Sequence, residues 1–307
     1  MNCDYFSGCV MGLLMGDAYG APFEGGPIER LAWRCIGKTK TGHLRYTDDS
    51  QMALDLGKSF LQNKIINQDH LAQQFSNSYH WSRGYGPSAA KLLKKISKGT
   101  HWSLLNKSIH KQGSWGNGAA MRAPILALCY FDDEMAMAKA VIKASEITHA
   151  HPLAIDGAIL IAWTTYAALH NKDTAFILSG LKERAETEGF KSRVGLCAEL
   201  VCATQEASFV VIKSKLGNSI TAEKSCLTAI YFALRYRTLS YSAMLSAICR
   251  LGGDTDTIGA MAGAIWGAFN GFDALDKNKA QKVEGYETFL LLSKQLHALV
   301  QKEQKQK

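Results

Sequence analysis

Two short acidic segments contain most of the side chains that could carry chemistry in this sequence. They are Thr47-Asp48-Asp49 and Asp254-Thr255-Asp256-Thr257. Each stands at the predicted start of a helix, where Thr or Asp caps free backbone N–H groups and the helix dipole favours anions. One helix start needs only one cap, however, and adjacent carboxylates repel each other. A hard divalent cation would relieve this repulsion, so the pattern favours a metal site, with double capping as the alternative.

The metal predicted from these side chains is Mg²⁺ or Mn²⁺. The two segments supply about six oxygen ligands, which is what one octahedral ion or a close pair of ions requires. No His or Cys stands among them, and the 8 cysteines form no CxxC pair, so zinc is disfavoured. A third acidic segment, Gly16-Asp17, recurs beside an apolar, glycine-rich stretch.

Two glycine-rich segments lie between the acidic ones and could bind a phosphorylated ligand. They are Arg83-Gly84-Tyr85-Gly86 and Gly113-Ser114-Trp115-Gly116-Asn117-Gly118. Backbone N–H groups of such loops cradle phosphates and an aromatic ring can stack on a base, although most glycine loops are only turns. His149 precedes a helix that Pro152 could open, where a packing or capping role is the alternative to a ligand contact. A Ser114–His149–Asp triad ranks lower, because no GxSxG surrounds Ser114 and the acidic segments would stay unexplained.

Helices must position these segments, because strand-like alternation is scarce in the sequence. Apolar periodicity predicts helices over 4–19, 48–62, 68–81, 88–97, 133–148, 153–170, 193–207, 222–236, 241–250 and 256–269. Two of them carry glycines four residues apart, which places each set on one face of its helix. Glycine costs about 1 kcal/mol against alanine inside a helix, so close packing of two buried helices is expected. These glycines are Gly8, Gly12, Gly16 and Gly20, and Gly259, Gly263 and Gly267.

The composition is that of an ordinary globular protein. The chain has 307 residues, of which 47% are hydrophobic and 20% charged, and no linker divides it. We therefore predict a single all-α domain over residues 1–300, followed by a basic polar tail over 301–307. Asp17 interrupts the first apolar stretch and Asp156 lies inside the longest one, so neither a signal peptide nor a membrane span is expected, and a cytoplasmic location is predicted.

The net charge is +8, with a group of lysines at Lys91, Lys94, Lys95 and Lys98. A solvated surface is the simpler interpretation of these lysines. Attraction to an anionic partner, such as nucleic acid or a phosphate-rich substrate, remains open.

Taken together, the motifs resemble the ADP-ribosylglycohydrolase family, whose members remove ADP-ribose from modified targets. Each motif is weak alone, but they follow the family's order from near residue 8 to residue 268. The matching stretches are GCVMGLLMGDAYGAPFEG, YTDDSQMAL, RGYG, GSWGNGAAMRAPILAL, THAHPLAIDGA and LGGDTDTIGAMAGAIWGA.

The resemblance implies an all-α orthogonal bundle with two Mg²⁺ ions in a central cleft. Glu24 matches the family's flexible-loop glutamate, the expected general acid/base, with Asp48 or Asp49 activating a water as the alternative. Both glycine-rich loops and His149 match segments that contact ADP-ribose, with Trp115 at a position that is commonly aromatic. The implied metal ligands are Thr47, Asp48, Asp49, Asp254, Asp256 and Thr257.

The function implied by the resemblance is hydrolysis of the bond between ADP-ribose and a modified protein. The metals would bind the 2′ and 3′ hydroxyls of the distal ribose and a water, while the bond breaks through an oxocarbenium-like state. Two alternatives remain. One is a non-catalytic ADP-ribose-binding or crystallin-like protein on the same fold. The other is a related metal hydrolase with a different nucleotide-like substrate.

Overall fold

The protein is built from α-helices, which confirms the predicted fold class. The computed structural model describes residues 2–305, apart from the side chain of Glu29. Within that range it contains sixteen α-helices, short 3-10 turns and three isolated β-bridges, but no β-strand. The helices are α1 (Cys3–Gly20), α2 (Pro27–Ile36), α3 (Asp48–Asn63), α4 (Gln68–Ser78), α5 (Pro87–Ile96), α6 (Pro124–Cys129), α7 (Glu134–Glu146), α8 (Pro152–Leu169), α9 (Thr174–Arg184), α10 (Glu188–Cys202), α11 (Phe209–Lys215), α12 (Cys226–Arg235), α13 (Tyr241–Leu251), α14 (Thr255–Asn270), α15 (Lys277–Ala280) and α16 (Tyr286–Gln304).

All ten predicted helices are present, with boundaries shifted by a few residues, and six further helices were not predicted. These six are α2, α6, α9, α11, α15 and α16. The longest of them, α16, buries Phe289, Leu292, Leu296 and Val300, spaced three or four residues apart, against α1 and α3. It continues to Gln304, so the first four residues of the predicted tail are helical, while 306–307 lie outside the described residues.

The two glycine-bearing helices, α1 and α14, cross in direct backbone contact. A Cβ atom at Gly12 would lie 2.1 Å from the carbonyl oxygen of Gly263, and one at Gly16 would lie 2.0 Å from that of Gly259. Gly8 meets Gly267 in the same way. The prediction that these faces pack closely is therefore confirmed. Because the pairing is antiparallel, the C-terminal end of α1 lies beside the N-terminal end of α14.

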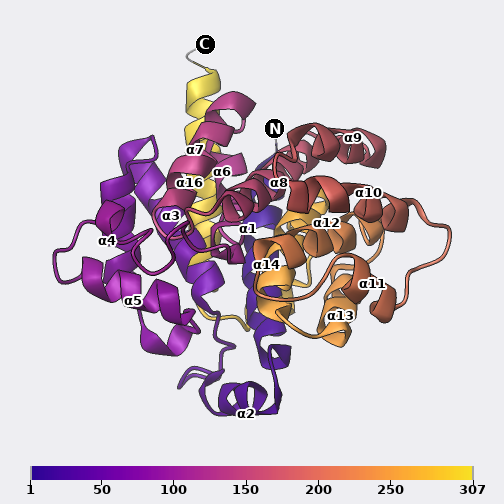
Figure 1. The fold of residues 1–307 in the computed structure, drawn as a ribbon. Helices are drawn as coiled ribbons and strands as arrows, with labels where there is room; N and C mark the ends of the chain where they lie inside the picture. The colour runs from indigo at the N-terminus through magenta and orange to yellow at the C-terminus, as the bar shows by residue number, and fades with distance from the viewer. Residues whose placement is uncertain (1, 306–307) are drawn as a thin grey trace.

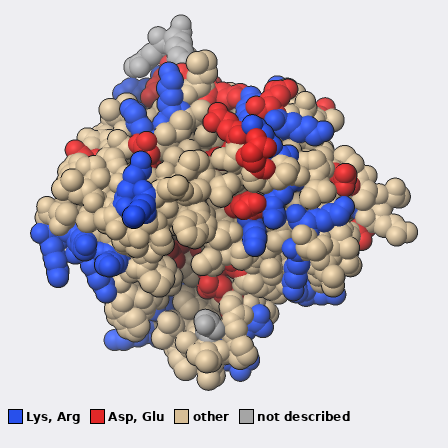
Figure 2. Space-filling model, in the orientation of Figure 1, with Lys and Arg blue, Asp and Glu red and all other residues tan. Residues whose placement is uncertain are grey.

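The remaining helices surround this central pair (Figure 1). Helices α3, α4 and α5 lie on one side of it and α9 to α13 on the other, while α2 closes the lower end of the view. The lower ends of α1 and α14 are thus the place where segments distant in sequence converge. Figure 2 shows acidic atoms in a hollow of the surface above α2, and basic side chains gathered over α5, where Lys91, Lys94 and Lys95 are exposed.

One helix within residues 2–305, α8, is long and apolar enough to cross a membrane by length and composition alone. Its mean hydropathy is 1.4 over 18 residues, and 72% of that window is buried inside the protein. It packs against α6, α7, α12 and α14. Asp156 on this helix is buried and accepts hydrogen bonds from the backbone N–H groups of Glu186 and Thr187, just before α10 begins.

Candidate metal centre and active site

The first acidic segment is fixed to the end of α1 by Asp17. This fully buried carboxylate accepts hydrogen bonds from the N–H of Thr47 (2.9 Å) and from the N–H (3.0 Å) and hydroxyl (2.6 Å) of Ser50. Thr47 in turn caps α3 by accepting from the N–H of Asp49. Because Thr47 and Asp17 already satisfy the start of this helix, neither Asp48 nor Asp49 is needed as a cap.

The second acidic segment begins α14, next to the last turn of α1. Its tight entry uses Gly253, whose backbone is left-handed (φ +86°), a conformation that favours glycine. The hydroxyl of Thr255 donates to the carbonyl oxygen of Gly20 (2.9 Å), which ties α14 to α1. Asp254 stands at the N-cap position but makes no capping hydrogen bond; it accepts instead from the side-chain amide of Asn117 (2.5 Å). Capping therefore does not explain the Asp254 carboxylate.

The two segments meet, and their carboxylates form two overlapping groups. The hydroxyl of Thr257 donates to Oδ2 of Asp49 (3.3 Å), across 208 residues of sequence. In each group the ligand atoms lie within 4.8 Å of one another, and Asp256 belongs to both. The groups are Asp17, Asp49 and Asp256, and Glu24, Asp254 and Asp256. Asp256 therefore connects two groups, each of which could hold a metal ion.

The electrostatics of this cluster would also favour a bound cation. Oδ1 of Asp49 and Oδ1 of Asp256 are buried without a hydrogen-bond partner among the described residues. Burial, and then the charge of Asp17, raises the pKa of Asp49 well above its ordinary value. Burial raises the pKa of Asp256 in the same way, followed by the charges of Glu24 and Asp49. Several buried carboxylates in mutual repulsion are costly, and bound divalent cations would offset that cost.

Asp48 and Asp17 differ from their predicted places in this cluster. Asp48 is half-buried, and its pKa is raised well above the ordinary value by burial and then by Asp17, with Glu24 and Asp254 contributing. It therefore belongs to the same electrostatic cluster, although it is in neither of the two groups of three. Asp17 was recognised in the sequence as acidic but was not assigned to the site. The signal that could have identified it is a carboxylate inside the long apolar, glycine-rich stretch of α1.

Glu24 follows a short 3-10 turn at the end of α1 and reaches the second carboxylate group. It is half-buried, and its backbone N–H donates to the carbonyl oxygen of Ala21 (3.2 Å). The N–H of the next residue, Gly25, donates to the carbonyl oxygen of Gly253 (3.1 Å), so this loop is held against the entry to α14. The structure thus brings Glu24 to the carboxylates of Asp254 and Asp256.

The loop over residues 113–118 lies beside the second carboxylate group. The backbone N–H of Asn117 donates to the carbonyl oxygen of Ile220 (3.0 Å), while its side chain bonds Asp254. Trp115 is 46% exposed, with the rings of His110 and His151 at centroid distances of 5.2 and 6.0 Å. Trp115 is therefore not a core residue, and part of its surface is available to stack on a ligand.

His149 lies beneath this loop with its ring against the glycines. A Cβ atom at Gly118 would lie 2.7 Å from Nε2 of His149, so only glycine leaves room for the ring. Nδ1 of His149 bonds the hydroxyl of Thr148 (2.8 Å). The hydroxyl of Ser114 accepts from the N–H of Gly116 (3.4 Å), and no hydrogen bond between Ser114 and His149 occurs in residues 2–305. The alternative of a Ser114–His149 triad is thus not supported by the geometry.

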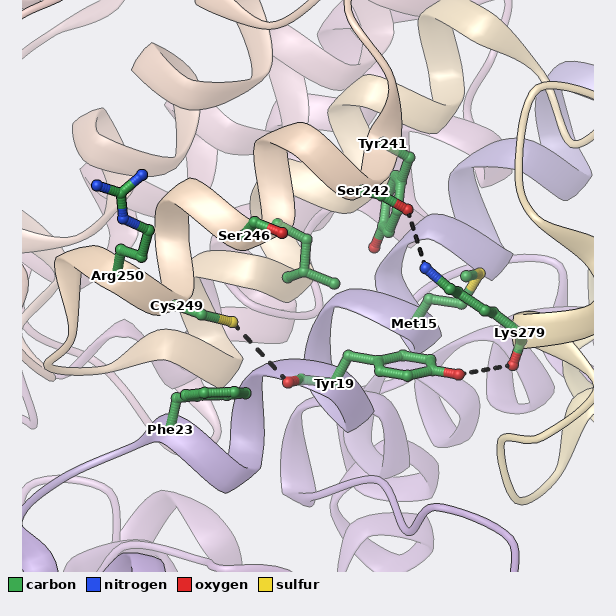
Figure 3. A pocket seen from close by; sticks show the side chains of 10 residues that line it. Met15, Tyr19, Phe23, Tyr241, Ser242, Ser246, Cys249, Arg250 and Lys279 are labelled. Carbon is green, nitrogen blue, oxygen red and sulfur yellow. Dashed lines mark hydrogen bonds between the residues drawn. The ribbon is translucent and has the colours of Figure 1, made fainter.

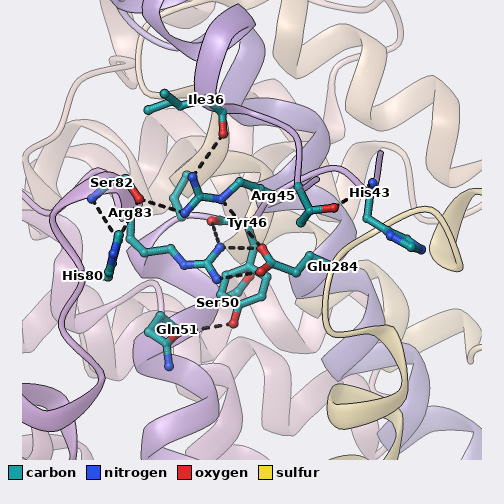
Figure 4. Close-up of polar contacts among 12 residues, drawn as sticks. Ile36, His43, Arg45, Tyr46, Ser50, Gln51, His80, Ser82, Arg83 and Glu284 are labelled. Carbon is teal, nitrogen blue, oxygen red and sulfur yellow. Dashed lines mark hydrogen bonds and ion pairs between the residues drawn. The ribbon is translucent and has the colours of Figure 1, made fainter. Parts of the chain in front are cut away.

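The loop over residues 83–86 reaches the site with its backbone rather than with its side chains. Arg83 is buried and pairs with both carboxylate oxygens of Glu284 (2.7 and 3.1 Å), while also donating to the carbonyl oxygen of Tyr46 (Figure 4). Tyr85 is buried as well. Gly84 is left-handed (φ +85°), and a Cβ atom there would lie 3.7 Å from Oδ1 of Asp48. We predicted Arg83 and Tyr85 as ligand contacts; the structure places both side chains inside the protein, where they hold the loop.

Gly86 is the last residue of the loop over 83–86, and Gly113 is the first residue of the loop over 113–118. Gly86 is the N-cap residue of α5 and has open space around its Cα. Gly113 is left-handed (φ +87°), and a Cβ atom there would lie 2.7 Å from the backbone of Ala150 and His151. Both are therefore turn residues that direct their loops.

A separate apolar pocket of about 370 Å³ lies between α1, α13 and α15 (Figure 3). Met15, Tyr19 and Leu245 contribute apolar surface to it, and Arg250 and Lys279 are its cations. None of the predicted site residues lines it. Phe23 does, so the pocket adjoins the loop that carries Glu24 without containing the acidic cluster.

The fold and this site define a class of protein: an all-α protein with a carboxylate cluster that could hold metal ions at the junction of two helices. Comparison with known proteins gives the family. The sequence model of the ADP-ribosylglycohydrolase family matches residues 3–306, and the chain belongs to this family. It is therefore an enzyme of the glycosyl hydrolase type.

Individual relatives agree with this assignment over nearly their whole length. The chain is 31% identical to human (Homo sapiens) ADP-ribosylhydrolase ARH3 over 348 residues, which covers 97% of this chain and 94% of the relative. It is 28% identical to the uncharacterized protein YegU of Escherichia coli, covering 90% of each. Among solved structures, an ADP-ribosylglycohydrolase-related protein complex aligns with a TM-score of 0.71 over 96% of this chain and 98% of that chain, at 21% identity, which supports the fold.

Proposed function

We propose that this enzyme hydrolyses the glycosidic bond between ADP-ribose and a modified target, with two Mg²⁺ ions bound in the acidic cluster. The observation that carries the proposal is the pair of carboxylate groups that share Asp256. Mn²⁺ has similar ligand preferences and would substitute. The proposed metal-binding residues are Thr47, Asp48, Asp49, Asp254, Asp256 and Thr257, to which the structure adds Asp17 as a further candidate.

The residues present fit such ions. All of the side chains in the cluster offer oxygen, and two buried oxygens, on Asp49 and Asp256, lack any partner among the described residues. Hard cations prefer these ligands. When bound, the ions supply Lewis-acid stabilisation of negative charge and orient hydroxyl groups of the substrate.

Glu24 is the proposed general acid/base. Its position on a loop at the edge of the cluster, half-buried, suits a group that must exchange a proton with substrate or water. In this role it donates a proton to the leaving group, or takes one from the attacking water, as the anomeric bond breaks. If Glu24 instead binds a metal, Asp48 or Asp49 is the next candidate for activating the water.

The two loops are proposed to bind the base and the diphosphate of ADP-ribose, which are the parts of the ligand remote from the bond that breaks. Trp115 offers an exposed aromatic surface to the base, and the glycine-rich backbone of the two loops is proposed to bind the diphosphate. Binding energy at these remote contacts serves to orient the anomeric carbon. We propose an ADP-ribosylated protein as the target because the human relative carries the name ADP-ribosylhydrolase.

The test is turnover on a panel of defined linkages, with ADP-ribose attached to arginine, serine, an acetyl ester, poly(ADP-ribose) or nucleic acid. Release of free ADP-ribose is measured by chromatography in Mg²⁺, in EDTA, and after Mg²⁺ is restored. We expect release from at least one linkage that is lost in EDTA and recovered with Mg²⁺. Binding of ADP-ribose without release from any linkage would refute the hydrolase function for these targets.

A further inference from the structure

Arg122 is a buried cation that forms no direct ion pair, although the charge of Asp48 acts on it from a distance. It is 1% exposed, and none of the ion pairs formed within the described range, residues 2–305, includes it. Burial lowers its pKa to about 9, so the guanidinium is still charged at neutral pH. A buried charge normally needs compensation, and one contact lies on the last turn of α7, where the helix dipole is negative. Its acceptors are the carbonyl oxygens of Gly118 (2.7 Å) and Ala144 (2.9 Å), the hydroxyl of Thr148 (2.9 Å) and Sδ of Met52 (3.8 Å).

The contacts of Thr148 determine where its hydrogen points. A guanidinium can only donate, so the Thr148 hydroxyl accepts from Arg122. The other recorded partner of that hydroxyl is Nδ1 of His149, 2.8 Å away. Among the described residues Nδ1 is the one acceptor within reach of that hydroxyl, so its single hydrogen is satisfied only by donating to Nδ1, and a ring that accepts at Nδ1 carries its own hydrogen at Nε2.

The surroundings of His149 also keep the ring neutral. Its side chain is buried, and its pKa is lowered to about 3 by burial, followed by the charges of Arg122 and His110. Nε2 forms no hydrogen bond with any described residue, and His149 is still 9% exposed. The ring is thus a neutral donor with a fixed tautomer.

The ring and the guanidinium act on the same loop. Nε2 of His149 lies 3.4 Å from the place a Cβ atom of Gly116 would take, and Arg122 donates to the carbonyl oxygen of Gly118. Between these glycines, Asn117 bonds the carboxylate of Asp254. A continuous path of contacts therefore runs from the buried cation through the ligand-binding loop to the acidic cluster.

We propose that Arg122 is a positioning residue: acting through Thr148, it holds His149 as a neutral Nε2–H donor for an oxygen atom of the ADP-ribosyl group. This inference rests on the proposed function, because that function supplies the ligand. A donor held in one tautomer before binding needs no reorientation when the ligand arrives. The same guanidinium fixes the loop that carries Trp115.

The experiment compares Thr148→Val, which removes the hydroxyl, with Thr148→Ser, which restores it. Two-bond ¹H–¹⁵N spectra of the ligand-free protein report the tautomer of His149, and calorimetry gives the Kd for ADP-ribose. In the wild type we expect a protonated Nε2 and a bare Nδ1 between about pH 5 and 8. Thr148→Val should give a mixture of tautomers and raise Kd roughly two- to tenfold, the range for one neutral hydrogen bond, with kcat changed less. Thr148→Ser should recover a single tautomer.

Two further variants separate positioning from folding. Thr165→Val removes a buried hydroxyl that bonds only the carbonyl oxygen of Ile161 in α8, so it measures the general effect of the substitution. Arg122→Lys keeps the positive charge but loses the planar guanidinium with its several N–H donors, and it should give the same mixture of His149 tautomers as Thr148→Val.

A hydrogen on Nδ1 in the wild type, or an unchanged tautomer and Kd in Thr148→Val, would overturn the inference. Because the tautomer is measured without ligand, its result is independent of turnover. An inactive protein with the expected tautomer would refute the proposed hydrolase while supporting the relay from Arg122 to His149.

Discussion

Replacing Gly16 by alanine should weaken both the fold and the metal site, because this glycine stands where α1 and α14 touch. The added Cβ would lie 2.0 Å from the carbonyl oxygen of Gly259. An ordinary carbon–oxygen contact is about 3.3 Å, so the helices would have to separate there by about 1.3 Å. The obstructing atom belongs to a helix backbone, and no side-chain rotation can relieve the contact.

The expected change in the free energy of unfolding for Gly16→Ala is the difference of two opposing effects. Overpacking of this kind costs about 3 kcal/mol, at the upper end of the usual range because the backbone must move. Alanine is favoured over glycine in a helix by about 1 kcal/mol, which leaves a net loss of about 2 kcal/mol. For a chain of 307 residues that loss corresponds to a fall in Tm of about 3 °C.

The metal site should respond as well, because Asp17 directly follows Gly16 and Asp256 lies on the helix that must move. Mg²⁺ tolerates little departure from octahedral geometry, and disturbing the support of a metal site usually costs about 10–100-fold in affinity. We therefore expect Gly16→Ala to weaken Mg²⁺ binding by at least tenfold. Differential scanning calorimetry measures Tm, and isothermal titration with Mg²⁺ measures affinity.

Two control variants make this test specific. Gly195→Ala on α10 adds the same Cβ where no atom lies within 4 Å, and should raise Tm slightly. Gly8→Ala at the other end of the crossing meets Gly267 at 2.3 Å, so it should lower Tm as Gly16→Ala does while leaving Mg²⁺ affinity much less affected. A wild-type Tm in Gly16→Ala would refute the close helix contact. Equal Mg²⁺ affinities in Gly8→Ala and Gly16→Ala would refute the link between the crossing and the metal site.

Three further substitutions test the site itself. Asp256→Ala should abolish Mg²⁺ binding and turnover together, because this carboxylate belongs to both groups; titration with Mg²⁺ alongside turnover checks it, and full activity in EDTA would contradict a metal mechanism. Glu24→Gln should lower kcat by roughly 10²–10⁴-fold with little change in the Kd for ADP-ribose, and normal turnover would move the acid/base role to Asp48 or Asp49. Trp115→Ala should weaken ADP-ribose binding by about 1–3 kcal/mol without unfolding the protein, since the side chain is 46% exposed; a collapse in Tm would instead show a structural role.

Much of the fold and part of the site could be predicted from local sequence. The ten helices with strong apolar periodicity were predicted because a repeat of apolar residues every 3.6 positions is visible in the local sequence, without knowledge of which segments pack together. Helix α11 was missed because its β-branched residues disfavour a helix on their own, and α16 because charged and polar residues dilute its apolar face. In both cases tertiary packing, which is invisible to local patterns, stabilises the helix.

The assignments of individual side chains show the same limit. Arg83 beside glycines has the composition of a phosphate-binding residue, yet its partner Glu284 lies 201 residues away in sequence and occupies the guanidinium. The carboxylate of Asp17 and the pair of Arg122 and Thr148 gain their roles only through neighbours brought close by folding.

The sequence by itself determined that acidic side chains begin two helices and that glycine ridges lie on two helices, one of which also begins with an acidic segment. It also determined that these motifs occur in the family's order. These are properties of composition and spacing along one chain. Only the tertiary structure decided that α1 and α14 cross antiparallel, so that Asp17 meets Asp49 and Asp256 joins two carboxylate groups. The physical reason is that metal binding depends on oxygen atoms within a few ångströms of one point, and that distance is set by how closely two glycine-faced helices can pack.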